Sequence, residues 1–151
     1  MLGRLTITCT VKRPKLKSLE FADTSGFFSA YVQTDRFHDA TVQAFKRDTR
    51  LITTRSVVME TVSLLSKRIS PFHARQWYEL LQKDKALEIL EWDKATYKEA
   101  EQIWKKHRDK AWDLIDCYSM AVMVRLKIKF ALTYDHHFSQ AGFETLLDSV
   151  S

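Results

Sequence analysis

The chain has 151 residues, of which 45% are hydrophobic, and it contains only 3 glycines and 2 prolines. This length and composition predict one helix-rich domain. The net charge is +5, but +4 of it lies in residues 1–20, so charge alone does not identify an RNA-binding face. No apolar run reaches the roughly 18 residues that span a membrane, and the two cysteines match no zinc or redox spacing. We expect a cytoplasmic protein that does not associate with membranes.

Strand-like and helix-like segments alternate along the chain. A short apolar run at 19–22 predicts a strand that ends in a polar turn, and helices are expected next at 26–33 and 38–48. The elements expected after these are a strand at 51–53, a helix from the N-cap Thr54 to Arg68, a helix from Pro71 to about Lys83, a strand at 87–90, helices from the caps Asp93 and Asp113 to about His107 and Leu126, and strands at 128–133 and 144–147.

This alternation predicts right-handed crossovers and a parallel sheet. The expected fold class is α/β, an α/β/α sandwich with a four- to five-stranded parallel sheet and a helical arm. Residues 19–151 form the expected domain, and residues 1–18 precede it as an extension whose order the sequence does not define.

Apolar residues at helical spacing identify the expected core. The buried stripes of two helices are predicted to be Val57, Thr61, Leu64 and Leu65, and Leu114, Cys117, Ala121 and Val124. The tryptophans are expected in the core or in the wall of a groove, since bases stack only on exposed aromatics; they are Trp77, Trp92, Trp104 and Trp112. Basic clusters such as residues 105–110 most simply form solvated helix faces, with phosphate contacts as the alternative.

Four carboxylates converge on this scaffold. Asp23 stands at the end of the first strand, and Asp135 stands just beyond the fourth. Glu60 and Asp116 occupy the early turns of helices that begin where strands end, and helix side chains lean toward the N-terminus. All four therefore point toward the carboxyl edge of the sheet, where open α/β folds bind ligands.

Carboxylates that share a crevice repel one another unless a cation neutralises them. Oxygen-rich sites suit Mg²⁺ or Mn²⁺, which activate water and stabilise phosphate charge during phosphodiester hydrolysis. A single Asp at a strand end or helix start is more often a cap or turn former. The metal site is therefore inferred from the set and from Glu60, which interrupts the mostly apolar run 57–62.

From Phe21 to about Leu147 the chain resembles the PIN-domain family, and within it the bacterial toxin ribonucleases of the VapC type. The segments that carry the resemblance are Ala22-Asp23-Thr24-Ser25, Leu51-Ile52-Thr53-Thr54 before Val58-Met59-Glu60, Asp109-Lys110-Ala111-Trp112 before Asp116-Cys117, and residues 131–138 leading to Ala141-Gly142-Phe143.

The resemblance implies a Mg²⁺- or Mn²⁺-dependent endoribonuclease that cuts tRNA or ribosomal RNA. It also implies a homodimer that a cognate antitoxin protein holds inactive. By motif match the acidic site is Asp23, Glu60, Asp116 and Asp135, and Asp109 is a further ligand or a neighbour of the ligands.

The sequence departs from the family pattern at two places. About 18 residues precede the first strand; they are interpreted as an extra strand, an RNA-binding arm or a leader foreign to the natural protein. Asp113 stands where the pattern has Ser, and we expect a helix cap there in preference to an added ligand. Of the two neighbouring histidines, His136 is expected to be exposed and His137 to orient its loop. Thr24 and Ser25 are expected to bond backbone or a metal-bound water.

Two other classes of function remain as alternatives. One is a catalytically decayed PIN-like scaffold or RNA-binding protein, which the four intact acids disfavour. The other is a DNA nuclease or phosphatase that uses the same metal chemistry. The Asp-Thr-Ser turn followed by two helices disfavours the haloacid type of phosphatase.

Overall fold

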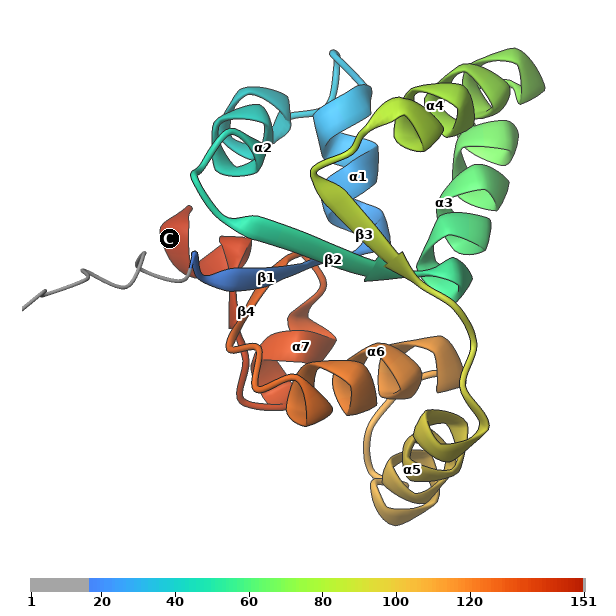
Figure 1. The fold of residues 1–151 in the computed structure, drawn as a ribbon, viewed down its shortest axis with the longest axis vertical. Coiled ribbons are helices and arrows are strands. Elements are labelled where there is room, and N and C mark those ends of the chain that lie inside the picture. Colours follow the sequence, from blue (N-terminus) through green and yellow to red (C-terminus); the bar gives the residue numbers. More distant parts are fainter. Residues whose placement is uncertain (1–16, 151) are drawn as a thin grey trace, which may run out of the picture.

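A five-stranded parallel sheet lies between two layers of helices (Figure 1) in the computed structural model, which describes residues 17–150. The elements are β1 (Leu19–Ala22), α1 (Thr24–Tyr31), α2 (His38–Phe45), β2 (Arg50–Thr54), α3 (Arg55–Arg68), α4 (Pro71–Lys83), β3 (Leu87–Leu90), α5 (Lys94–Lys106), α6 (Leu114–Arg125), β4 (Phe130–Leu132), α7 (His136–Gln140), β5 (Glu144–Thr145) and a 3₁₀ helix (Leu146–Ser149). The expectations for residues 1–16 lie outside the described residues.

The strand order β3-β2-β1-β4-β5 places β1 at the centre of the sheet. Phe21 pairs in parallel with Ile52 of β2 on one side and with Ala131 of β4 on the other. Helices α1 to α4 cover one face and α5 to α7 cover the other, and α3 and α4 form the predicted helical arm (Figure 1). The predicted α/β/α sandwich is confirmed, with five strands.

Side-chain caps explain why α3 and α5 begin where the sequence predicts. The Thr54 hydroxyl accepts the Val57 N–H at 3.2 Å, and the Asp93 carboxylate accepts the Thr96 N–H at 2.8 Å. Each cap satisfies a backbone donor that the first turn of a helix leaves free. The helix α7 was not predicted, because its five residues are too few to show helical periodicity.

Part of the predicted core is wrong. Trp77 and Trp112 are buried as expected, but the exposed fractions are 59% for Trp92, 48% for Trp104 and 64% for Val124. The two exposed tryptophans lie before α5 and in its last turn, on either side of Thr96 and Ala100, the buried residues of that helix. Val124 lies in the last turn of α6, just beyond its buried segment 117–123. None of the helices within residues 17–150 has the length and apolar character needed to cross a bilayer.

Candidate active site and metal centre

Asp23 connects the central strand to the first helix and is 6% exposed. Its Oδ2 accepts a hydrogen bond of 2.9 Å from the Thr133 hydroxyl. The pKa of Asp23 is raised to about 7, chiefly by burial; the charges of Glu60 and Asp116 also raise it, while hydrogen bonds from Thr133 and the Thr24 backbone lower it. Asp23 is therefore a carboxyl group that is hard to ionise without a cation.

Glu60 reaches the same place from the second turn of α3. The Thr24 hydroxyl, in the first turn of α1, donates to its Oε2. Burial raises the pKa of Glu60, and the charges of Asp113, Asp116 and Asp135 add to this rise. Three acids from other elements are thus near enough to repel Glu60.

Asp116 lies in the first turn of α6 and faces the same cluster. Its Oδ2 accepts the backbone N–H of Asp113 at 3.1 Å and lies 2.9 Å from Nδ1 of His137. A carboxylate only accepts, so the His137 ring carries its proton on Nδ1. Burial raises the pKa of Asp116, and the charge of Asp113 raises it further.

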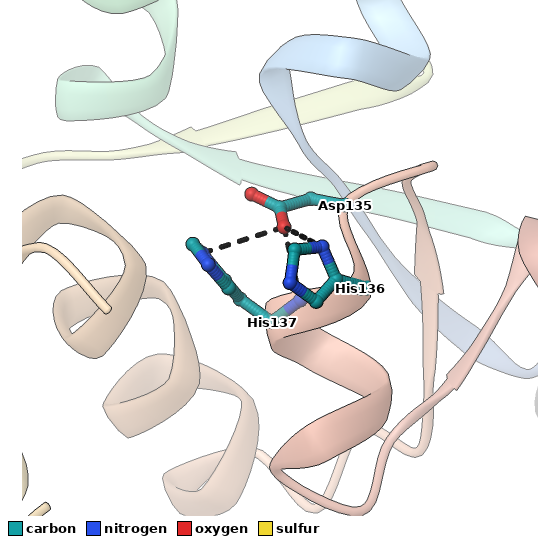
Figure 2. A group of neighbouring side chains, drawn as sticks. All are labelled: Asp135, His136 and His137. Carbon is teal, nitrogen blue, oxygen red and sulfur yellow. Dashed lines mark hydrogen bonds and ion pairs between the residues drawn. The ribbon is translucent and has the colours of Figure 1, made fainter. Parts of the chain in front are cut away.

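Asp135 forms the N-cap of α7. Its Oδ1 accepts the backbone N–H of His137 at 2.9 Å and lies 3.4 Å from the Nδ1 of that ring (Figure 2). His137 therefore links Asp135 to Asp116, which agrees with its expected orienting role. His136 is exposed as predicted. The ligand atoms of Asp135, His136 and His137 lie within 4.8 Å of one another, but His137 already contacts both acids.

Thr133, which the sequence analysis did not single out, holds the two sides of the site together. Its hydroxyl donates to Asp23 and accepts the backbone N–H of Asp135 at 3.0 Å. Ser25 Oγ lies 2.9 Å from Thr133 Oγ1 and accepts the backbone N–H of Tyr134 at 2.8 Å. Since Thr133 gives its proton to Asp23, Ser25 donates to Thr133. The Thr two residues before Asp135 was visible in the sequence, but only the parallel pairing of β1 with β4 shows its partner.

Gly26 allows α1 to approach β4 closely. A Cβ at this position would lie 2.1 Å from the Leu132 carbonyl oxygen, so no side chain fits there without moving backbone. The Asp23 N–H donates to the same carbonyl oxygen at 3.2 Å. The first turn of α1 is thereby fixed against the strand that leads to Asp135.

Asp113 and Asp109, the other two acids considered from the sequence, have different surroundings from each other. Asp113 caps α6 as expected, its Oδ1 accepting the Asp116 N–H at 2.8 Å, and its charge also acts on Glu60 and Asp116. Asp109 is exposed and paired with Lys110 at 3.3 Å, and its pKa is lowered by a backbone hydrogen bond and by Lys110. The structure brings the four predicted acids together and leaves Asp109 outside them.

The donor set fits a hard divalent cation. Four carboxyl groups, from the N-caps of α1 and α7 and from the first two turns of α3 and α6, supply oxygen ligands, and three of them have raised pKa values because they are buried near like charges. Oxygen ligands are those that Mg²⁺ and Mn²⁺ prefer. A cation would therefore relieve the repulsion that this arrangement creates.

Comparison with known families matches residues 21–144 to the PIN domain. The chain belongs to the PIN domain family. Among solved structures, this PIN domain is similar to the Mycobacterium tuberculosis toxin VapC20, described as cleaving the sarcin-ricin loop: 22% identity, TM-score 0.77, covering 82% of this chain and 95% of that one. It is also similar to FitAcB from Neisseria gonorrhoeae, with 16% identity and a TM-score of 0.63 over 83% of this chain and 95% of that one. A third similar structure is VapBC2 from Rickettsia felis bound to promoter DNA, with 11% identity and a TM-score of 0.61 over 84% of this chain and 96% of that one. At these identities the matches show a shared fold. A sequence search of curated proteins found no match.

Proposed function

We propose that this PIN domain is an endoribonuclease dependent on Mg²⁺ or Mn²⁺ and acts as the toxin of a toxin–antitoxin pair. The observation that carries the proposal is the convergence of Asp23, Glu60, Asp116 and Asp135 at the carboxyl edge of the sheet. Their mutual effect on pKa calls for a cation, and phosphodiester hydrolysis is the reaction that such a site serves.

In this proposal the four acids hold the cation, and neighbouring side chains orient three of them. Thr24 orients Glu60, Thr133 orients Asp23, and His137 orients Asp116. When bound, the cation neutralises the carboxylates, activates water and stabilises charge on the phosphate. No histidine base is required, so His137 serves as a positioning residue.

The proposed protein partner is an antitoxin that supplies an amphipathic helix and a basic tail. An apolar groove of about 340 Å³ is bordered by Phe27 and Tyr31 of α1, Phe45 at the end of α2 and Trp77 of α4. It shares α1 with the acidic site, which would accept an Arg or Lys of the tail. Solved relatives include toxin–antitoxin complexes, VapBC2 among them. We propose that the substrate is tRNA or ribosomal RNA and that the protein acts in the cytoplasm.

A homodimer completes the proposed assembly. Met59 on α3 and Phe72 on α4 are large apolar side chains with exposed fractions of 65% and 62%. Exposed apolar surface of this kind is typical of protein contacts. The oligomeric state of the purified chain tests this part independently of cleavage.

The decisive test compares wild type with Glu60→Gln on RNA, duplex DNA and a small phosphomonoester. We expect wild type to cleave RNA only, with Mg²⁺ or Mn²⁺ and not in chelator, and to arrest growth when expressed alone. Glu60→Gln should fold normally and do neither, whereas Glu79→Gln, an exposed glutamate on α4, should behave as wild type. Cleavage undiminished in excess chelator, or growth arrest undiminished by Glu60→Gln, would refute the metal mechanism.

A further inference from the structure

Three flat side chains form a continuous stack beside the acidic site. The rings of Phe37 and Tyr134 lie face to face, with centroids 4.1 Å apart and planes 7° from parallel. The Arg36 guanidinium lies over the Phe37 ring at 4.4 Å from its centroid. Tyr134 directly precedes Asp135, so one end of the stack is joined to the acidic cluster by a single peptide bond.

Hydrogen bonds on both sides hold this stack in place. Thr41 donates to the Phe37 carbonyl oxygen at 2.7 Å, so the contact of 2.7 Å between its hydroxyl and Tyr134 is donated by the Tyr134 hydroxyl. The Tyr134 N–H is bound by Ser25, and the Phe37 N–H by Asp35 at 2.9 Å. The platform under Arg36 is therefore rigid relative to the carboxylates.

The outermost member of the stack is exposed and has no acidic partner. Within residues 17–150, Arg36 has the Phe37 ring as its contact and no carboxylate within ion-pair distance. Four other arginines have a carboxylate within that distance, namely Arg47, Arg50, Arg55 and Arg125. Arg68, Arg75 and Arg108 have no such partner among the described residues, but unlike Arg36 they do not lie over an aromatic ring. Cation–π contact fixes the plane of the guanidinium and leaves its N–H groups free for another ligand.

We propose that Arg36 binds a backbone phosphate of the RNA strand that enters the acidic site; this inference rests on the proposed ribonuclease function. An acidic cluster repels a polyanion, so a substrate needs positive charge at its rim to bind. A guanidinium presents a fork of donors that matches a phosphate. Arg36 is a binding residue in this proposal and takes no part in bond cleavage.

The test is binding of a short, labelled, single-stranded RNA to the full chain, measured by fluorescence anisotropy in chelator over a series of salt concentrations. We expect Arg36→Ala to bind about tenfold more weakly, the effect of losing one charge-assisted hydrogen bond. The slope of log K against log salt should become shallower by about 0.7, the value for one phosphate contact on a single strand. The matched control, Arg75→Ala, removes an exposed arginine of α4 and should change neither quantity.

A second variant separates the platform from the charge. Phe37→Leu keeps apolar bulk and Arg36 but removes the flat ring, so it should weaken binding while the salt slope stays that of wild type. Arg36→Ala protein that binds with the affinity and slope of Arg75→Ala would overturn the proposal, as would wild type that binds no RNA. Wild type that binds RNA through Arg36 but cleaves none with Mg²⁺ or Mn²⁺ would contradict the ribonuclease function and leave the phosphate site standing.

Discussion

Replacing Asp113 with Ser should leave α6 capped. The Asp113 carboxylate accepts the Asp116 N–H at 2.8 Å, and a Ser hydroxyl at an N-cap accepts the same donor. Loss of a cap costs about 0.5–2 kcal/mol of unfolding free energy. We therefore expect Asp113→Ser to lie within about 0.5 kcal/mol of wild type and Asp113→Ala to be about 1 kcal/mol less stable, both measured by urea unfolding.

The same substitution should move the pH dependence of cleavage. The charge of Asp113 raises the pKa values of Glu60 and Asp116, and a cation binds their ionised forms. Without this charge both groups ionise at lower pH. The acid limb of cleavage rate against pH should therefore shift to lower pH in Asp113→Ser and in Asp113→Ala alike.

Asp116→Asn should have the opposite effect to Asp113→Ser, because it should remove cleavage. The amide oxygen of the new side chain can still accept the Asp113 N–H, so the protein should fold, but the amide supplies no charge to a cation. Circular dichroism and cleavage of a labelled RNA over a range of Mg²⁺ concentrations measure both properties. Folded Asp113→Ser that is inactive at every Mg²⁺ concentration would make Asp113 a ligand and refute the division of roles, and active Asp116→Asn would remove Asp116 from the site.

Three further predictions follow from the same site. Saturating Mg²⁺ or Mn²⁺, at 100 times its dissociation constant, should stabilise the fold by about 2.7 kcal/mol; an unchanged thermal melt would argue against a resident cation. The pKa of Asp23 lies at about 7, above the ordinary 3.8, so its contribution to metal-free stability should be full below 3.8 and lost as pH rises through 7. Unfolding in chelator should show this loss, and Asp23→Asn should remove it; identical pH profiles would contradict the assignment. Deletion of residues 2–16 leaves intact the 2.9 Å bond from the Arg50 N–H to the Ser18 carbonyl and should preserve folding and cleavage, whereas an unfolded product would make them part of the domain.

The sequence sufficed for the order of elements, because strand and helix periodicities differ and the caps at Thr54, Asp93 and Asp113 give helix starts. It also sufficed for the convergence of the four acids, because parallel strands end at one edge of the sheet. The wrong predictions concern burial at the ends of helices, which the periodicity of apolar residues does not define. Trp92 and Trp104 have apolar surfaces that suit a core, but Trp92 precedes α5 and Trp104 lies in its last turn, so both lie beyond the buried residues of that helix.

The contacts between side chains of distant segments were likewise beyond the sequence. Thr133 bonds a carboxylate 110 residues away, and His137 bonds Asp116 across 21 residues. These partners depend on the strand order and on the orientation of α7, which is too short to be predicted from a pattern. Asp109 belongs to the resembling segment, yet its position in an exposed turn beside Lys110 is a local property of this chain.

The central position of β1 has a consequence during synthesis. Asp23, which follows β1, must wait for β4 and α7, the segment that supplies Thr133 and Asp135, before the acidic cluster is complete. A nascent chain that has emerged only through α6 has three of the four acids and lacks the strand that orders the first. The enzyme proposed here would thus stay inactive on the ribosome until almost the entire domain has been translated, which gives an antitoxin already present in the cell time to bind.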